Sequence, residues 1–408
     1  MMCSSTNELK GKEKEKLIKR NNLFFILSKL DITAMVIPVI VKVWELANLS
    51  FAQMLLLQGI FALSIMIFEI PSGAFSDMFK RKLVLVTGYS ILTVACFLYF
   101  IGRSFTAYAL AEALFGVGGA VISGSDVSLV YDGLIEINET ERYKQILSKA
   151  TTLSFLTAMI SLPISGLIAL HNIYTPLLII SISFGFKAVM FLFVYEPERK
   201  KAESINGATV KSIKLLIHSK FLISIFIATF SLSVFGRAVF WSYQPKLFAL
   251  NISTFEIGLI FATMNLIAAL SSTIMGKVKQ KFELLAVYAF LVIETISYLV
   301  IWKLHSLLIL TAIYALQITR GGRAPIISQM IQRKLSSDLR ATFTSFISAI
   351  TNLAFFIYSL LLNFYNVTID TTVFSAMIGA TLLLPFFFIL NNFKLNNNEL
   401  NYTLQVLK

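Results

Sequence analysis

Long apolar runs follow one another along nearly the whole of this 408-residue chain, and they constrain its fold more than any other feature. Each run is long enough for a helix to cross the hydrocarbon layer of a bilayer, about 30 Å thick. Only 14% of the residues are charged, against about 25% in soluble domains. The sequence therefore predicts an all-α membrane protein with twelve transmembrane helices, at 22–43, 51–75, 83–101, 105–132, 148–170, 173–195, 219–246, 253–276, 283–302, 306–332, 341–363 and 368–391.

Lysine and arginine gather on one side of these predicted spans. With the N-terminus inside, the cytoplasmic segments hold 26 of the 35 Lys and Arg residues, and the outer loops and helix ends hold four. This positive-inside bias predicts that both termini are cytoplasmic. The net charge of +13 is thus explained by membrane orientation. We expect no nucleic-acid partner, because no surface module of aromatic and basic residues accompanies the charge.

The remaining composition predicts a simple membrane protein without metal or cofactor. We expect no cleavable leader, because the first twenty residues are polar and lysine-rich and the first apolar run is long enough to span. Cys3 falls in the inner tail and Cys96 in the third span, so no disulfide framework is implied. His171, His218 and His305 lie near helix ends without the spacing of metal ligands.

Two copies of one half are visible at an offset of 203 residues. Spans two and eight both begin with a capping box, in which a serine accepts a backbone N–H and a Gln or Glu three residues later reaches back. The aligned pairs are Asn48 with Asn251, Ser50 with Ser253, Gln53 with Glu256, Gly73 with Gly276 and Phe79 with Phe282. We predict a basic cytoplasmic tail (1–21), a six-helix half (22–195), a cytoplasmic linker (196–218), a second six-helix half (219–391) and a cytoplasmic tail (392–408).

One loop carries a recognisable motif. Residues 69–82 read Glu-Ile-Pro-Ser-Gly-Ala-Phe-Ser-Asp-Met-Phe-Lys-Arg-Lys, and they join spans two and three. Gly-x-x-x-Asp-x-x-x-Arg-Lys in this setting resembles the signature loop of the major facilitator superfamily, although Lys80 stands where a glycine is usual. The resemblance implies two pseudo-symmetric six-helix halves, transport by alternating access and no enzymatic activity.

The resemblance also implies a role for the charged residues of this loop. An acid and basic residues at a cytoplasmic boundary can make and break contacts as the two halves rock. The second copy of the loop has decayed, since Gln280 occupies the place of the acid. We therefore assign the conformational switch to Gly73, Asp77, Arg81, Lys82 and Arg142.

We place nine ionisable residues at membrane depth within the predicted spans: Lys29, Asp31, Glu112, Asp126, Lys187, Arg237, Glu294, Arg320 and Arg323. An unpaired charge is costly there, and a functional role is the default. Seven of them lie on spans 1, 4, 7 and 10, which line the central cavity in the family that the chain resembles. The alternative for each is a structural ion pair, an alternative that weighs most for Lys187 and Glu294. We assign the solute and proton cavity to Asp31, Glu112, Arg237, Trp241, Tyr243 and Arg320, with Glu112 or Asp31 as the proton carrier.

Depth along the helix singles out a second pair. Asp126 lies six residues before Asp132, at the inner end of span four, and Arg323 lies two residues before Pro325, in the inner half of span ten. We predict that Asp126 and Arg323 form an inner gate. Span four also carries Gly116, Ala120 and Gly124 at the spacing that lets membrane helices approach closely.

The leading functional hypothesis is a monomeric secondary transporter of the plasma membrane that exports a small amphipathic molecule or drug in exchange for protons. Pro163 and Gly166, which match part of an antiporter motif in span five, favour export. One alternative is a proton-coupled uptake symporter for an organic, anionic solute, which three intramembrane arginines could hold. A remote alternative is a multi-helix membrane enzyme, although the loops are short and carry no catalytic constellation. No Gly-x-x-x-x-Gly-Lys loop for ATP is present.

Overall fold

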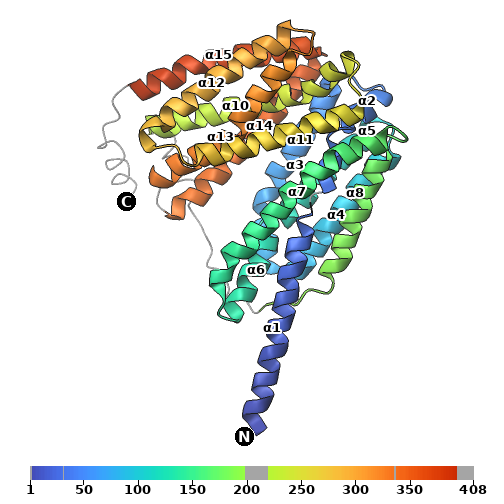
Figure 1. The fold of residues 1–408 in the computed structure, drawn as a ribbon, viewed down its shortest axis with the longest axis vertical. Coiled ribbons are helices and arrows are strands. Elements are labelled where there is room, and N and C mark those ends of the chain that lie inside the picture. The colour runs from blue at the N-terminus through green and yellow to red at the C-terminus, as the bar shows by residue number, and fades with distance from the viewer. Residues whose placement is uncertain (1, 31, 198–218, 335–336, 393–408) are drawn as a thin grey trace. The chain divides into compact units, whose positions relative to one another are not determined.

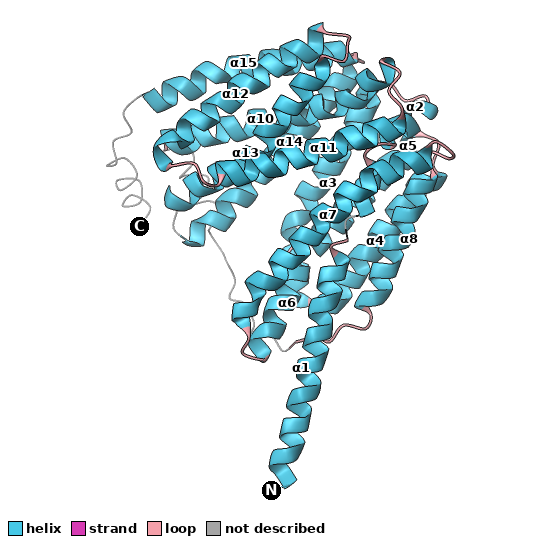
Figure 2. Ribbon diagram, in the orientation of Figure 1, coloured by secondary structure: helices cyan, strands magenta, loops and turns pink. Residues whose placement is uncertain are grey.

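The computed structural model describes residues 2–30, 32–197, 219–334 and 337–392, and helices make up the regular structure of this part of the chain (Figures 1 and 2). The side chains described are those of residues 12–30, 32–69, 79–197, 219–331 and 345–387. The elements are α1 (Met2–Ser28), η1 (Ile32–Val36), α2 (Ile40–Leu46), α3 (Phe51–Met78), α4 (Arg81–Ile101), α5 (Phe105–Ile122), α6 (Ser125–Glu136), η2 (Thr140–Arg142), α7 (Tyr143–Ala169), α8 (Thr175–Phe191), α10 (Lys220–Ala249), α11 (Thr254–Met275), α12 (Gln280–Lys303), α13 (Ile309–Lys334), α14 (Ser337–Phe364) and α15 (Ile369–Asn392).

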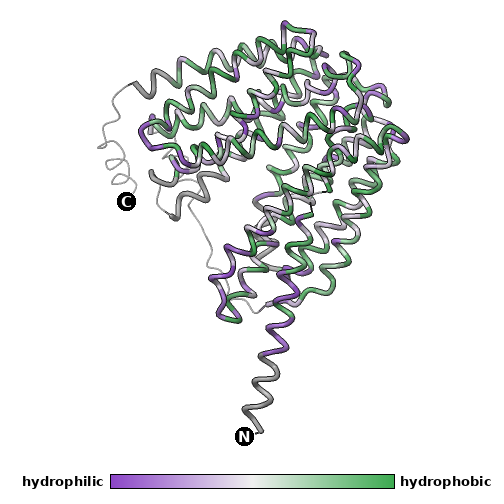
Figure 3. The backbone as a smooth tube through the Cα atoms, viewed as in Figure 1, coloured by the Kyte–Doolittle hydropathy of each residue, from purple (hydrophilic) through white to green (hydrophobic). Residues whose placement is uncertain are grey.

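Each of the twelve predicted spans coincides with a helix or with a helix broken in two. Within the described residues, nine helices are long and apolar enough to cross a membrane, and a tenth joins them if α1 and α2, bent by 42°, form one span. The other two are α8, which has only 17 residues, and α13, whose arginines lower its hydropathy. Figure 3 shows apolar residues along most of the helices, with hydrophilic stretches in the loops and in the middle of α1.

The first predicted span is broken between Ser28 and Ile40. α1 ends at Ser28, a short 3-10 turn covers Ile32–Val36, and Pro38 precedes α2. Proline has no N–H to donate and disfavours helical backbone in the residue before it. A break inside a membrane is tolerated where buried side chains satisfy the freed carbonyl groups. Ser165 does so here, because its hydroxyl donates to the Met35 carbonyl at 2.5 Å.

The fourth predicted span is also broken, between α5 and α6. Gly124 separates the two helices with φ +79°, in the left-handed region that glycine adopts without the steric cost of a Cβ atom. The second helix therefore has its own N-terminus within the predicted span, and Asp126 lies in its first turn. The partial positive charge of a helix N-terminus stabilises a carboxylate at this place.

The internal repeat is present in the backbone. Asn48 and Asn251 both adopt left-handed backbone, with φ of 58° and 60°. The following residues close matching loops, because the Leu49 N–H donates to the Trp44 carbonyl at 3.1 Å and the Ile252 N–H donates to the Leu247 carbonyl at 3.2 Å. These are the bonds of a Schellman motif at a helix C-terminus. They fall at the same offset of 203 residues, so the repeat extends to local geometry.

The first capping box is formed as predicted. The Ser50 N–H donates to Gln53 Oε1 at 2.9 Å, and the Gln53 N–H donates to Ser50 Oγ at 3.2 Å. Each of these two bonds satisfies a backbone N–H at the start of α3 that has no partner inside the helix. In the second copy, α11 begins at Thr254, directly after Ser253.

The chain divides into two compact units. Unit 1 consists of residues 1–49, 60–203 and 254–259, and unit 2 consists of 50–59, 204–253 and 260–408. In unit 1 the most extensive helix packing joins α4 to α5 and to α8. In unit 2 it joins α10 to α15, and α12 to α13 and α15. The predicted linker, 196–218, falls largely on residues outside the described part of the chain, as does most of the predicted tail at 392–408.

Small residues permit close helix packing in both units. A Cβ atom on Gly116 would lie 2.8 Å from the Phe61 carbonyl oxygen, so α5 approaches α3 closely at this point. A Cβ atom on Gly321 would lie 2.0 Å from the Ala268 carbonyl oxygen, so α13 lies directly on the backbone of α11. Backbone atoms cannot yield as side chains do, and these glycines therefore set the distance between the helices.

Candidate functional site

Unit 2 contains a cavity of about 260 Å³ lined by α10, α12 and α13. Its charged lining is unbalanced, because three arginines face it together with one carboxylate. Aromatic rings and an amide complete the polar and stacking surface. These residues are Arg237, Phe240 and Tyr243 from α10, Glu294 and Tyr298 from α12, and Gln317, Arg320 and Arg323 from α13.

The three arginines hydrogen-bond neutral oxygens. Within the described residues none of them belongs to an ion pair, and each donates one side-chain hydrogen bond. The bonds run from Arg237 Nη1 to Asn352 Oδ1 (3.1 Å), from Arg320 Nη2 to Asn265 Oδ1 (2.5 Å) and from Arg323 Nη1 to the Leu232 carbonyl (2.6 Å). A guanidinium has five N–H donors, so most of the donors around this cavity are available to an anion. Arg323 also repels both other arginines.

Glu294 is the carboxylate of this cavity. It is 1% exposed, and it accepts hydrogen bonds from the Tyr298 hydroxyl and, at 3.2 Å, from the Ser231 hydroxyl. It attracts the charge of Arg323, but no ion pair joins the two among the described residues. The sequence analysis left Glu294 as a candidate structural pair. The spacing of four between Glu294 and Tyr298, which puts both on one helix face, is the signal that would have indicated a polar site.

The two aromatic residues assigned to the solute cavity, Trp241 and Tyr243, lie in different surroundings. Tyr243 lines the cavity of unit 2 and is 3% exposed. Trp241 is not among the lining residues, and its ring packs edge-to-face on Phe240, with centroids 5.4 Å apart. Phe240, which the sequence analysis did not single out, faces the cavity because it lies three residues from both Arg237 and Tyr243 on the same helix face.

Unit 1 contains a second cavity, of about 440 Å³, whose lining includes Lys29, Asp126 and Lys187. Lys29 forms an ion pair with Asp126 Oδ2, and Asp126 Oδ1 accepts the Val127 N–H at 2.7 Å. Both oxygens of the predicted gate residue are thus engaged within unit 1. Asp31, assigned to the solute cavity, lies outside the described residues.

Lys187 supports the break in the first span. Its Nζ donates to the Leu30 carbonyl at 3.0 Å and lies over the rings of Phe184 and Tyr89, at 5.4 and 6.0 Å from their centroids. The same carbonyl also accepts the Ile32 N–H at 3.0 Å, so Lys187 adds a second donor to a carbonyl that lies beyond the end of α1 at Ser28. The structural role considered for Lys187 is therefore to hydrogen-bond backbone at the break in the first span.

Glu112 lines neither cavity. It is 5% exposed on α5 and interacts with Tyr99 and Cys96 of α4. The Tyr99 ring stacks on Tyr108 at 5.5 Å, so the carboxylate is enclosed in the packed α4–α5 contact. It is not among the residues that line the cavity of unit 1.

The signature loop is described only in part. Gly73 and the side chain of Asp77 lie outside the part of the chain whose side chains are described. Arg81 Nε pairs with Asp132 Oδ2 at 2.8 Å. The carboxylate of Glu196 accepts the N–H of Arg81 at 2.8 Å and that of Lys82 at 2.9 Å, and so caps the start of α4. Glu196 was missed because it lies 115 residues away and was read as the first residue of the linker.

Two further contacts lie at the same end of unit 1. Arg142 pairs with Glu139 at 2.5 Å, across a single 3-10 turn. The Tyr195 hydroxyl donates to Glu136 Oε1 at 3.1 Å. Charged and polar side chains thus join the ends of α4, α6 and α8 at the boundary that carries the signature loop.

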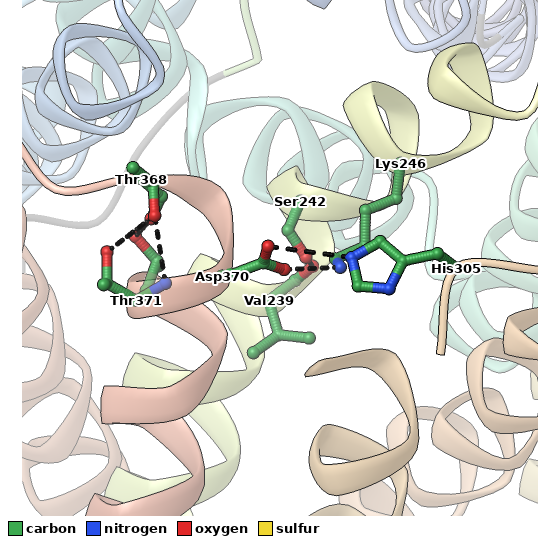
Figure 4. A network of polar contacts seen from close by, with 8 residues as sticks. Val239, Ser242, Lys246, His305, Thr368, Asp370 and Thr371 are labelled. Atoms are coloured by element: carbon green, nitrogen blue, oxygen red, sulfur yellow. Dashed lines mark hydrogen bonds and ion pairs between the residues drawn. The ribbon is translucent and has the colours of Figure 1, made fainter. Parts of the chain in front are cut away.

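A separate polar network lies in unit 2 (Figure 4). Lys246 Nζ, from the last turn of α10, pairs with Asp370 Oδ1 at 2.7 Å, and the imidazole Nε2 of His305 lies 3.8 Å from Asp370 Oδ2. The Lys246 side chain is 8% exposed, whereas Asp370 and His305 are 48% and 69% exposed. The network ties α10 to the first turn of α15 and to the loop after α12.

Membrane-spanning helices in two repeated halves, with polar cavities enclosed by apolar helices, define a multi-pass membrane transporter. The particular family follows from comparison with known proteins. The family model for the Major Facilitator Superfamily matches residues 24–359, and the chain therefore belongs to that superfamily. Its members are transporters and not enzymes, which agrees with the prediction from the signature loop.

Similar proteins support the same family and fold. The uncharacterized MFS-type transporter YxaM of Bacillus subtilis (strain 168) is 25% identical over 276 residues, covering 64% of this chain and 67% of that protein. The structure of a bacterial homolog to the human lysosomal transporter Spinster, inward-facing and unoccupied, has a TM-score of 0.71 at 13% identity, covering 92% of this chain and 96% of that chain. The nucleoside transporter NupG has a TM-score of 0.71 at 11% identity, covering 93% and 100%.

Proposed function

We propose that this chain is a secondary active transporter that carries a small organic anion across the membrane by alternating access. The observation that supports this most is the set of three arginines around one cavity of unit 2, which the described part of the protein leaves without ion-pair partners. Buried cations are costly unless an opposite charge neutralises them. A solute with a carboxylate, sulfonate or phosphate group supplies that charge, and arginine binds such groups bidentately.

The same cavity favours a small solute with a flat apolar part. Its volume of about 260 Å³ is just below the range of about 300–1,000 Å³ for drug-sized ligands. Phe240, Tyr243 and Tyr298 provide ring faces and edges beside the guanidinium groups. Aromatic pairs in such arrangements add affinity beyond the area they bury.

The cavity of unit 1 also favours an anion over a cation. Two lysines, Lys29 and Lys187, line it with one described carboxylate, Asp126. A cationic amphipathic drug would meet an excess of positive charge in either cavity. Proton-coupled drug export, the leading hypothesis from sequence, therefore becomes the rival, and charge selectivity distinguishes it from anion transport.

The mechanism that we propose keeps the assignments from the sequence. Gly73, Asp77, Arg81, Lys82 and Arg142 act in the conformational switch. In the outward-facing state, Asp126 and Arg323 form the inner gate, for which Arg323 must displace Lys29 from the carboxylate. A gate of this kind is broken by Arg323→Glu and partly restored by adding Asp126→Arg, as measured by transport in proteoliposomes. For the coupled proton, the sequence prediction is Glu112 or Asp31, and Glu294 of the arginine-lined cavity is the competing carboxylate.

The setting of the protein follows from the charge bias along the sequence. We propose that it acts as a monomer in the plasma membrane, with both termini in the cytoplasm. Its partners are then the bilayer, the solute and protons, and nucleic acid is not among them. Cysteine labelling of an N-terminal and a C-terminal position in intact cells tests this orientation, because a membrane-impermeant reagent should reach neither.

Charge selectivity is the test of the proposed function. Three molecules of nearly equal shape differ in charge: benzenesulfonate, neutral benzenesulfonamide and cationic benzamidine. Only benzenesulfonate should bind the purified protein in calorimetry. Arg320→Gln should weaken its binding about 10- to 150-fold, since a hydrogen bond to a charged group contributes about 1.5–3 kcal/mol. Succinate and phenyl phosphate extend the search to carboxylates and phosphates.

A matched control distinguishes the loss of an arginine from the cavity from the loss of a positive charge elsewhere in the protein. Arg103, between α4 and α5, hydrogen-bonds the Phe100 carbonyl at 2.8 Å and lies over the Tyr174 ring, so Arg103→Gln removes an arginine outside the cavity. This variant should bind benzenesulfonate as the wild type does. Preferential binding of benzamidine, or equal losses in both variants, would reject an anion site and favour the rival function.

A further inference from the structure

We propose that Glu294 is the proton-coupling residue, and that the solute's acidic group and the carboxylate of Glu294 compete for the same arginines. In the empty cavity Glu294 is ionised and serves as the resident anion. When the solute binds, a proton neutralises Glu294 and leaves the guanidinium groups to the solute. This inference rests on the proposed function, because it requires an anionic solute.

Position supports this role more directly for Glu294 than for Glu112. Glu294 lines the cavity with the three arginines, whereas Glu112 is enclosed in the α4–α5 contact. Arg323 is the arginine whose charge acts on Glu294. A carboxylate and a bound anion that share a cationic cavity repel each other, and the repulsion is strong where water is largely excluded.

α12 packs against α10, α13 and α15, and the charged and titratable groups that line the cavity with Glu294 come from α10, α12 and α13. Its own helix provides Tyr298, α10 provides Arg237 and Tyr243, and α13 provides Arg320 and Arg323. The acid of α15 is Asp370, whose carboxylate is engaged by Lys246. Among the described side chains Glu294 is therefore the acid of this cavity, and a proton that binds inside the cavity binds there.

The hydrogen-bond partners of Glu294 can serve both protonation states. Tyr298 and Ser231 donate to the two carboxylate oxygens in the ionised form. A hydroxyl oxygen also accepts, so a protonated Glu294 can donate to Ser231 while Tyr298 continues to donate to the other oxygen. Both oxygens of Glu294 therefore keep a hydrogen bond in either protonation state, which lowers the cost of taking up and releasing a proton.

The competition implies symport. A proton on Glu294 strengthens solute binding, and by reciprocity the solute strengthens proton binding. The proton enters from the aqueous side to which the cavity is open, and leaves with the solute on the other side. One proton for each monovalent anion makes the cycle electroneutral. An inside-alkaline gradient of one pH unit then sustains about tenfold accumulation, because one pH unit is equivalent to about 1.36 kcal/mol.

Proton uptake on binding is the first test, with benzenesulfonate as the probe because its own charge is constant between pH 5 and 9. Wild-type protein in weakly buffered detergent solution should take up as much as one proton per bound benzenesulfonate, as measured with a pH indicator. Glu294→Gln should still bind benzenesulfonate and take up none. Glu283→Gln is the matched control, since Glu283 is a buried acid of α12 that does not line the cavity.

Transport provides the second readout. In proteoliposomes the wild type and Glu283→Gln should accumulate benzenesulfonate about tenfold under a gradient of one pH unit. Glu294→Gln should exchange labelled for unlabelled benzenesulfonate at comparable rates, but accumulate none. A merely structural role for Glu294 would lower exchange and accumulation together.

The outcomes separate this inference from the proposed function. Wild-type binding of benzenesulfonate without proton uptake anywhere from pH 5 to 9 overturns the role of Glu294 and leaves the anion site standing. Proton uptake that persists in Glu294→Gln moves the proton to another residue and also overturns it. Failure of benzenesulfonate, succinate and phenyl phosphate alike to bind the wild type removes the anion site, and this inference with it.

Discussion

The ion pair between Lys29 and Asp126 permits a quantitative prediction about unit 1. The Asp126 side chain is 6% exposed and that of Lys29 is 33% exposed. Asp126→Asn leaves a lysine that can still reach water by extending its stem. Lys29→Gln instead leaves a carboxylate that is nearly inaccessible to water. We therefore expect the lysine substitution to destabilise the protein more than the aspartate substitution.

The magnitudes follow from this burial. Two unit charges about 4 Å apart attract by about 4 kcal/mol at an effective dielectric constant of about 20. Breaking a fully buried pair costs about 3–5 kcal/mol, whereas exposed pairs contribute about 0.2–1 kcal/mol. Since Lys29 is one-third exposed, we expect a loss of about 3 kcal/mol for Lys29→Gln and about 2 kcal/mol for Asp126→Asn. The Asn side chain still accepts the Val127 N–H, which limits the second value.

The assay is a double-mutant cycle on the free energy of unfolding. Denaturant unfolding in detergent, followed by circular dichroism, gives the two single variants, the double variant and the wild type. The coupling energy should reach about 1–2 kcal/mol, since residues in direct contact do not behave additively. Lys42 and Glu45, a more exposed pair at 3.0 Å, provide the control cycle, with an expected coupling of at most about 0.5 kcal/mol.

Two results would refute this reasoning. Additive effects, with a coupling below about 0.5 kcal/mol, would mean that the pair does not stabilise unit 1. A larger loss for Asp126→Asn than for Lys29→Gln would contradict the argument from burial. The second result would also support Arg323 as the main partner of Asp126.

Two further substitutions probe helix packing and the signature loop. Gly321→Ala places a methyl group 2.0 Å from the Ala268 carbonyl oxygen. We expect a loss of about 1–3 kcal/mol in the free energy of unfolding, because the facing backbone cannot yield. An unchanged unfolding midpoint would mean that α11 and α13 are further apart. Arg81→Gln removes the partner of Asp132. It should lower the rate of benzenesulfonate transport while the binding affinity stays within a few-fold of the wild-type value. A loss of binding at an unchanged rate would place Arg81 in the solute site instead.

Features that depend on neighbouring residues could be predicted from the sequence alone. The predicted spans follow from local hydropathy, and each coincides with a helix or a broken helix. The repeat at offset 203 follows from turn and cap residues, and the left-handed Asn48 and Asn251 occur at matching places. These signals are local because a helix in lipid satisfies its backbone within itself. The family could be predicted from one loop because the signature motif is a run of neighbouring residues, 69–82.

Breaks within the helices could not be predicted from hydropathy. Gly124 and the stretch after Ser28 lie inside apolar runs, and each run was predicted as one helix. A break is tolerated only where other parts of the protein satisfy the freed backbone. Ser165 donates to the Met35 carbonyl from 130 residues away, and Lys187 adds a second donor to the Leu30 carbonyl from 157 residues away. The break is therefore supported by contacts that no local pattern contains.

The composition of the cavities was decided by tertiary structure. The sequence indicated which helices carry ionisable residues, and the structure brings Arg237, Tyr243 and Arg320 together around one cavity. It did not indicate that Glu294 faces the same cavity or that Glu112 faces α4. Almost every position in a membrane helix is apolar, so periodicity does not reveal which face is turned inward. That face is chosen by packing against helices far away in the sequence, and the partners of buried charges are fixed only when the helices assemble.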